Sequence, residues 1–137
     1  MTFGAELSTV HVTDDKNNTW GFGLRPFVRF YPVHKGNFKL FYQSGAGLVL
    51  FADNYPKQSG FFGDNREGTK PNGSPKYGIG AEFKLNKQLS GQAGLWHIHF
   101  SNGNNPSYDR NPGHDSNGFS VGLIYTPENE KNNQNFN

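Results

Sequence analysis

Hydrophobic and polar residues alternate with a period of two along much of the chain. The clearest stretch is residues 75–85, where Tyr77, Ile79, Ala81, Phe83 and Leu85 oppose Lys76, Gly78, Gly80, Glu82 and Lys84. Because successive side chains of a β-strand point to opposite faces, this pattern predicts a strand with one apolar face. Similar alternation predicts strands at residues 2–12, 19–32, 38–52, 89–102 and 118–125.

Turn-forming residues separate these expected strands. Short polar turns are expected at residues 13–18, 34–37 and 86–88, and longer loops rich in Gly, Asn, Pro and charge at residues 53–74 and 103–117. Short turns on one side and long loops on the other are typical of outer-membrane barrels. The last residues, from 127 to 137, are polar, and we expect them to form a disordered tail.

The face opposite the apolar one is made of glycine, Arg, Lys and Glu, and the chain contains 18 glycines. A soluble sandwich exposes its polar face to water, where so much glycine would be unusual. A small membrane barrel instead turns its apolar face to lipid and packs glycines and paired charges inside. The expected strands are also long enough to span a bilayer at a tilt. The pattern therefore predicts an all-β, antiparallel, up-and-down β-barrel of the outer-membrane type.

The number of expected strands is too small for such a barrel. Bacterial single-chain barrels have at least about eight strands, and an unpaired strand edge has no hydrogen-bonding partner in lipid. We therefore expect residues 1–126 to form a barrel domain that lacks its first hairpin. The start, MTFGAEL, has no basic segment followed by an apolar one, so we expect no signal peptide within this sequence.

Composition excludes several other classes of protein. The formal net charge is +2 and the basic residues are scattered, which argues against a nucleic-acid partner. No cysteine is present, so disulfides and thiolate metal sites are excluded. The sequence contains no run of about 18 apolar residues, so it predicts no transmembrane helix. A soluble lipid-binding β-barrel remains as an alternative to the membrane barrel.

Candidate chemistry lies in residues 96–118, WHIHFSNGNNPSYDRNPGHDSNG. His99 and Ser101 are two residues apart on an expected strand, so they point the same way with Cα atoms about 6.6 Å apart at roughly 3.3 Å of rise per residue. Asp115 follows after a loop that can fold back over the strand end. A nucleophile, a base and an acid that orients the base form the triad of a serine hydrolase. The alternative is a purely structural role, in which Asp115 only caps a turn.

The stretch from His99 to Asp115, with HFSNG followed by Asn-Pro-Gly and an acid, resembles the lipid A 3-O-deacylase family of PagL-type outer-membrane enzymes. Upstream segments also resemble strands of that family: LRPFVRFYP at 24–32, GAGLVLF at 45–51 and YGIGAEFKL at 77–85. Members of the family are eight-stranded barrels with the His-x-Ser pair on the penultimate strand. The resemblance therefore implies the same fold, a Gram-negative outer membrane as location, and lipid A of lipopolysaccharide as substrate.

The resemblance also implies roles for residues. Ser101 would be the nucleophile, His99 the general base and Asp115 the orienting acid, in place of the Glu that several members have. Gly103 N–H and the Asn102 side chain would be candidate oxyanion donors. The chemistry implied is hydrolysis of an ester-linked hydroxy fatty acid, with no cofactor and no metal. Loop cations, Lys57, Arg66, Lys70 and Arg110, would meet lipid A phosphates.

Other interpretations remain open. His97 shares the face of His99 and is either a neighbour of the triad, a headgroup contact or an interfacial histidine without chemistry. A metal site at His97 and His99 would need His114 or Asp115 as a third ligand, and we expect none. A catalytically silent barrel with a structural or adhesion role is the alternative function. The sequence leaves open whether two copies pair as a homodimer. The charged residues of the second face are expected to form an interior network: Glu6, Arg25, Arg29, Lys39 and Glu82.

Overall fold

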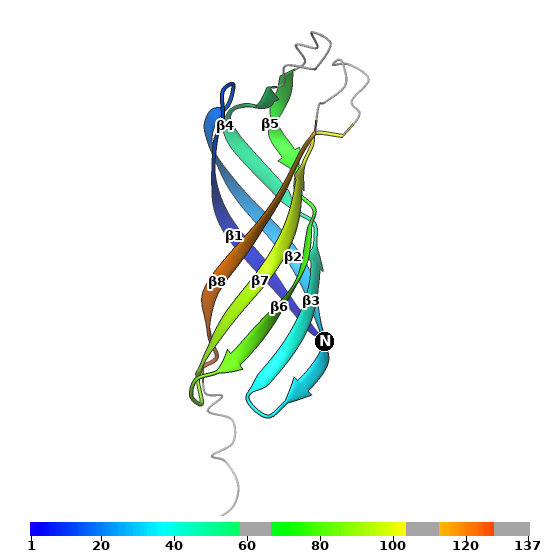
Figure 1. Cartoon of the computed structure of the whole chain (residues 1–137). Helices are drawn as coiled ribbons and strands as arrows, with labels where there is room; N and C mark the ends of the chain where they lie inside the picture. Colours follow the sequence, from blue (N-terminus) through cyan, green and yellow to red (C-terminus); the bar gives the residue numbers. More distant parts are fainter. Residues whose placement is uncertain (58–66, 104–112, 128–137) are drawn as a thin grey trace, which may run out of the picture.

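The computed structural model describes residues 1–57, 67–103 and 113–127 of the chain. In these ranges the regular secondary structure consists of β-strands, which form one antiparallel sheet. Along the chain they are β1 (Thr2–Thr13), β2 (Asn18–Lys35), β3 (Phe38–Gly45), β4 (Leu48–Lys57), β5 (Glu67–Gly73), β6 (Lys76–Lys84), β7 (Leu89–Phe100) and β8 (His114–Tyr125) (Figure 1). The predicted all-β antiparallel fold is confirmed. No helix in the described ranges has the length and apolar character needed to cross a membrane.

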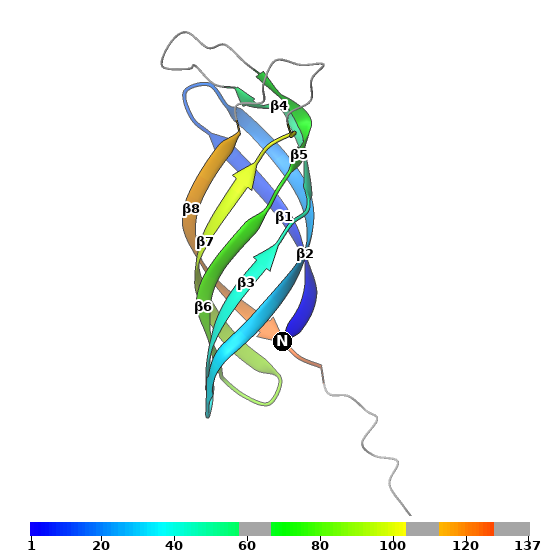
Figure 2. The ribbon, with the colours of Figure 1, turned by 90° about the vertical axis from the view of Figure 1, so that its right-hand side faces the viewer.

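Two pairs of strands run end to end, so the eight segments occupy six positions across the sheet. Strands β4 and β3 pair with successive parts of β2, and β5 and β6 continue beside them. Strands β1, β7 and β8 complete the order. In two perpendicular views the strands are steeply tilted and the sheet curls into a half-barrel (Figures 1 and 2).

The break between β3 and β4 has a steric cause. An added Cβ at Gly45 would lie 2.5 Å from the carbonyl oxygen of Pro26, and one at Gly47 would lie 2.1 Å from that of Leu24. The two glycines thus let the backbone approach β2 closely where Pro26, which has no N–H, cannot donate to the ladder. The prediction of one uninterrupted strand over 38–52 is wrong at this point.

Two loop predictions are also wrong. Residues 53–74 were expected to form a loop, but β4 extends to Lys57 and β5 occupies Glu67–Gly73. The loop expected at 103–117 ends earlier, because β8 begins at His114. Both segments lack apolar alternation, and they are strands because a neighbouring strand supplies their backbone partners.

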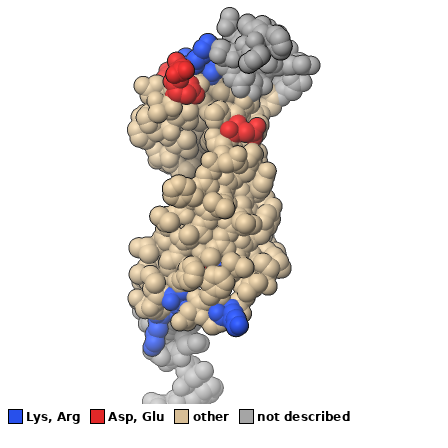
Figure 3. Space-filling model, in the orientation of Figure 1, with Lys and Arg blue, Asp and Glu red and all other residues tan. Residues whose placement is uncertain are grey.

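The sheet is apolar on its convex face and polar on its concave face. Leu24 is 53% exposed, whereas the adjacent Arg25 is 2% exposed. The large exposed hydrophobic side chains include Phe3, Leu7, Phe22, Leu48, Leu50, Ile79, Phe83, Leu95, Phe119, Val121 and Leu123. The face drawn in Figure 3 has charged groups near its two ends. A broad band without Lys, Arg, Asp or Glu lies between them. This arrangement suits a protein whose outer wall contacts lipid.

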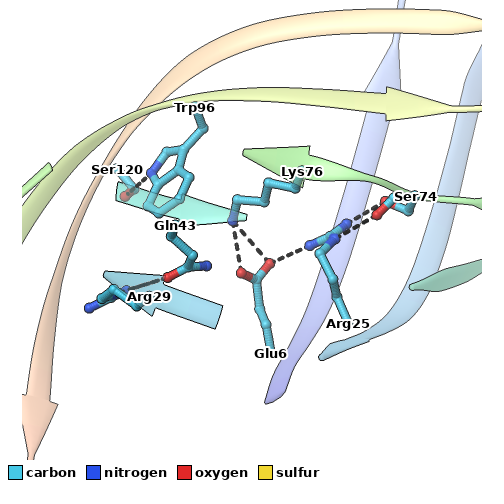
Figure 4. Close-up of polar contacts among 8 residues, drawn as sticks. All are labelled: Glu6, Arg25, Arg29, Gln43, Ser74, Lys76, Trp96 and Ser120. Atoms are coloured by element: carbon cyan, nitrogen blue, oxygen red, sulfur yellow. Dashed lines mark hydrogen bonds and ion pairs between the residues drawn. The ribbon is translucent and has the colours of Figure 1, made fainter. Parts of the chain in front are cut away.

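The interior charges form the predicted network. Arg25 Nη1 is 2.7 Å from Glu6 Oε1, and Lys76 Nζ is 2.8 Å from Glu6 Oε2 (Figure 4). Arg29 pairs with Glu82. Buried charges need such partners to be tolerated.

Lys39 was expected in the same interior network, but it lies over the Tyr31 ring, 5.4 Å from its centroid. The salt bridges between described side chains include none made by Lys39.

Interior glycines make room for aromatic rings. A Cβ at Gly78 would lie 2.7 Å from Trp96 Cε3, and a Cβ at Gly80 would lie 2.4 Å from Phe41 Cζ. The Trp96 indole crosses the concave face and donates to Ser120 Oγ at 2.7 Å (Figure 4). The glycines of the concave face are therefore required by packing, as expected for a narrow barrel interior.

Within the described residues, no strand pairs with the outer edge of β1 or with that of β8. The expectation that a further hairpin completes the barrel stays a prediction, as does the boundary of the barrel domain at residue 126. The expected disordered tail falls almost wholly on residues 128–137, which lie outside the described residues.

Candidate active site

The candidate residues lie at one end of β7 and β8, on the convex face. In the antiparallel ladder His99 is directly opposite Asp115, and His97 is directly opposite Asn117. Phe100, between His99 and Ser101, is buried on the other face at 2% exposure. Alternation therefore places His97, His99 and Ser101 on the lipid-facing wall, as the sequence predicts.

His99 and Asp115 are joined by a hydrogen bond. His99 Nδ1 is 2.8 Å from Asp115 Oδ1, so Nδ1–H donates to the carboxylate, and in the neutral ring Nε2 is the acceptor. We expected a loop to bring Asp115 close, but strand register does so because Asp115 belongs to β8. The shorter side chain of Asp suffices since the two residues are cross-strand neighbours.

The backbone of Ser101 is fixed by β5, the strand that the sequence did not predict. Gly73 N–H donates to Ser101 O at 2.6 Å, and Ser101 N–H donates to Gly73 O at 3.1 Å. One residue pair further down, His99 N–H donates to Pro75 O at 3.0 Å. The end of β7 is thus held between β8 and the junction of β5 and β6.

The Ser101 hydroxyl does not bond to His99 in this conformation. Its Oγ accepts from Gly103 N–H at 3.1 Å, and the hydrogen bonds of the described side chains include none between Ser101 and His99. Serine hydroxyls rotate about one bond, and catalytic hydrogen bonds are often long or absent without substrate. The structure therefore brings together His99 and Asp115 and places Ser101 beside them on the same strand face.

Two glycines shape the surroundings. Gly113 has φ +44°, and a Cβ there would lie 3.0 Å from His99 Cε1 and 3.5 Å from His99 Nε2. Gly103 has φ +71°, with nothing within 4 Å of an added Cβ. Both backbone conformations favour glycine. Gly113 thereby leaves space for the imidazole of His99.

The candidate oxyanion donors lie next to Ser101. Gly103 N–H already points at the Ser101 hydroxyl. The side-chain oxygen of Asn102 is buried and has no hydrogen-bond partner among the described residues. Residues 104–112, which follow directly, lie outside the described residues, as do the expected phosphate contacts Arg66 and Arg110.

His97 makes contacts that the sequence left undecided. Its Nε2 is 3.2 Å from Asp115 Oδ1, and its Nδ1 is 2.9 Å from Asn117 Oδ1. Asn117 was missed because the strand was expected to begin at residue 118. Had it been started at 114, the alternation would have placed Asn117 on the same face as Asp115.

His114, the other suggested metal ligand, faces away from this cluster. Its Nε2 is 2.8 Å from Ser116 Oγ, and its ring centroid is 5.6 Å from that of Tyr55 in the interior. His114 falls in the loop expected at residues 103–117, but it is the first residue of β8. In the described ranges no three His, Cys, Asp or Glu side chains are arranged to hold a metal ion.

A half-barrel with an apolar outer wall, together with a His–Asp pair beside a serine at its rim, points to a class: β-barrel hydrolases of the outer membrane. The comparison with family models narrows this class. The model of lipid A 3-O-deacylase (PagL) matches residues 2–124, nearly the whole chain. The chain belongs to this family, whose members are hydrolases that remove an acyl chain from lipid A of lipopolysaccharide in the Gram-negative outer membrane. No curated protein and no solved structure matches the chain.

Proposed function

We propose that this protein cleaves an ester-linked hydroxy fatty acid from lipid A by a Ser-His-Asp mechanism. Ser101 is the nucleophile, His99 the general base and Asp115 the acid that orients His99. The observation that carries this proposal is the 2.8 Å hydrogen bond from His99 Nδ1 to Asp115, made on the lipid-facing wall two residues before Ser101. In the neutral imidazole that bond places the proton on Nδ1, which makes Nε2 the nitrogen that accepts a proton.

The reaction takes two steps. His99 Nε2 takes the proton of the Ser101 hydroxyl as Oγ attacks the ester carbonyl, and the proton then passes to the departing sugar oxygen. The C–O bond to the sugar breaks and an acyl-Ser101 ester remains. Water, deprotonated by His99, attacks this ester, and the hydroxy fatty acid leaves as Ser101 regains its proton.

Rotation of the Ser101 side chain links nucleophile and oxyanion donor. In the present conformation Gly103 N–H donates to Ser101 Oγ. When Oγ turns toward His99 Nε2, this N–H is released and becomes a donor for the developing oxyanion, and the Asn102 side chain is the second candidate. Ser101 Oγ thus accepts the hydrogen bond of Gly103 N–H before substrate arrives and gives it up during the attack on the carbonyl.

The apolar wall offers a place for the acyl chain. Leu95 and Phe119 lie opposite one another two residues before the row of His97, and Phe119 is 82% exposed. An acyl chain in the outer leaflet would lie along this wall, with the sugar at the polar rim. Lys57 and Lys70, at the same end of the barrel, are candidate contacts for the phosphates of lipid A. Pairing of two copies stays a prediction.

The test is mass spectrometry of lipid A from Gram-negative cells that express the protein in a folded, outer-membrane form. Wild type is expected to remove one hydroxyacyl mass, and Ser101→Ala and His99→Asn to remove none. Ser90→Ala is the matched control, because Ser90 lies at the opposite end of β7, paired with Lys84 and Ile124 and away from the site. It is expected to act as wild type.

Unchanged lipid A in the presence of folded wild-type protein would contradict the proposal. The silent barrel with a structural or adhesion role would then be the better assignment. If Ser101→Ala kept full activity while wild type was active, deacylation would stand and the serine mechanism would be wrong.

A further inference from the structure

A second polar pair lies directly beside the proposed triad, one cross-strand row nearer the middle of the wall. His97 on β7 and Asn117 on β8 face one another, with His97 Nδ1 2.9 Å from Asn117 Oδ1. On the other side Tyr77 of β6 is the cross-strand neighbour of His97, and their ring centroids are 4.9 Å apart. The next row inward is apolar, so this row marks the boundary between the polar rim and the lipid-facing wall.

The contact with Asn117 accounts for only one nitrogen of His97. The other, Nε2, is 3.2 Å from Asp115 Oδ1, the same oxygen that accepts from His99 at 2.8 Å. Polar groups on a lipid-facing wall are costly unless they are hydrogen-bonded. An interfacial histidine with no role in the site would not need its second nitrogen aimed at the acid of that site.

The contact of Nδ1 with Asn117 bears on whether Nε2, the nitrogen that faces Asp115, carries a proton. If the carbonyl of Asn117 faces Nδ1, both ring nitrogens carry protons; if its amino group does, the proton of the neutral ring stands on Nε2. In both amide orientations we expect a proton on Nε2, facing Asp115 Oδ1 across the 3.2 Å contact, because an unprotonated Nε2 would set a lone pair against a carboxylate.

Asp115 needs such support. Its side chain is 63% exposed, and its hydrogen-bond and ion-pair partners within the described part of the chain are His97 and His99 alone. A short, exposed carboxylate held only by His99 can rotate about its χ1 and χ2 bonds. A second donor from the neighbouring row holds Oδ1 in place.

We propose that His97 is a positioning residue of the deacylase. It donates from Nε2 to Asp115, keeps Oδ1 directed at His99 Nδ1–H, and so keeps His99 Nε2 free to accept the proton of Ser101. His97 does not touch the reacting atoms. This inference rests on the proposed function, since it assigns His97 to the same site.

Two amide substitutions separate the contacts of His97. In His97→Gln the side-chain nitrogen reaches the place of Nε2, so the bond to Asp115 is kept. In His97→Asn the shorter amide reaches only the place of Nδ1, so the bond to Asn117 is kept and that to Asp115 is lost. Both are neutral and differ by one methylene. Tyr77→Phe keeps the ring beside His97 and is the control for a general effect of changing a residue in this cross-strand row.

The first measurement is steady-state hydrolysis of lipid A by the full chain folded in detergent micelles. For His97→Asn kcat is expected to fall about 10- to 100-fold, the scale on which misplacement of a catalytic group acts. KM is expected to change less than about twofold because His97 does not bind substrate. His97→Gln is expected to recover kcat to within about threefold of wild type, and Tyr77→Phe to equal wild type. Equal kcat values for His97→Asn and His97→Gln would overturn the proposal.

A second measurement does not depend on activity. A proton held between His99 Nδ1 and a carboxylate gives a low-field NMR resonance, which is expected in wild type, Ser101→Ala and His97→Gln, and weakened or lost in His97→Asn. Persistence of this resonance in folded His97→Asn would refute the positioning role even if wild type does not deacylate lipid A. Conversely, an inactive wild type whose resonance still depends on His97 would overturn the proposed function alone.

Discussion

Replacing Gly113 by alanine tests whether the space beside His99 matters for function. The φ of +44° places Gly113 in the left-handed region, and an added Cβ would lie 3.0 Å from His99 Cε1. Alanine in this region costs about 1–2 kcal/mol. The contact demands a further adjustment, because ordinary van der Waals contact begins at 3.4 Å. His99 must therefore move by about 0.4 Å, a difference taken from these two distances.

The effect of that movement on activity can be bounded. A misplacement of about 1 Å costs about 100-fold in rate, so on a logarithmic scale about 0.4 Å costs about sixfold in kcat. If all of it fell along the bond from His99 to Asp115, now 2.8 Å long, that bond would approach the limit of ordinary hydrogen bonding. We expect Gly113→Ala to lose about 1–2 kcal/mol of unfolding free energy and about sixfold in kcat.

Gly36→Ala is the matched control. Gly36 has φ +57° in the turn between β2 and β3, and nothing lies within 4 Å of an added Cβ. It carries the same kind of backbone strain without a neighbouring catalytic group. The assay is urea unfolding in micelles followed by tryptophan fluorescence, together with kcat on lipid A. The reasoning is refuted if the two variants lose stability to the same extent and Gly113→Ala keeps the kcat of Gly36→Ala.

Two further predictions concern stability. Arg25→Met removes a buried guanidinium and leaves Glu6 with one cation fewer, so the urea midpoint is expected to fall by the equivalent of about 3 kcal/mol; an unchanged midpoint would contradict this. In the turn after β1, burial acts to raise the pKa of Asp14, but hydrogen bonds from the backbone N–H groups of Lys16 and Asn17 and from the Asn17 side chain outweigh it, so the pKa lies below its usual value of 3.8. The stabilisation from Asp14 is therefore present above pH 3.8, the usual pKa, and is lost as the pH falls through the lower pKa of the folded state. The NMR shifts of the Lys16 and Asn17 amide protons should titrate with a midpoint below pH 3.8. Titration at or above that value would show that these bonds do not favour the ionised carboxylate.

The sequence alone determined the class of fold and most of the candidate site. A period of two fixes which side chains share a face, and it needs no knowledge of which strands pair. The alternation of apolar residues with glycine and charged residues therefore predicted a barrel whose apolar face points outward to lipid. The same rule put His97, His99 and Ser101 on one wall, with the burial of Phe100 as the structural check.

Only the tertiary structure decided how the site is held together. Strand β5 has no apolar alternation and contains Pro71, yet it pairs with β4 and fixes the backbone of Ser101 through Gly73. The register of β7 against β8 puts Asp115 opposite His99 and within reach of His97. Pairing and register depend on backbone hydrogen bonds between segments far apart in the chain, which leave no local trace in residue type. The chain thus encodes its faces locally, whereas the contacts that align the site arise only when the sheet has formed.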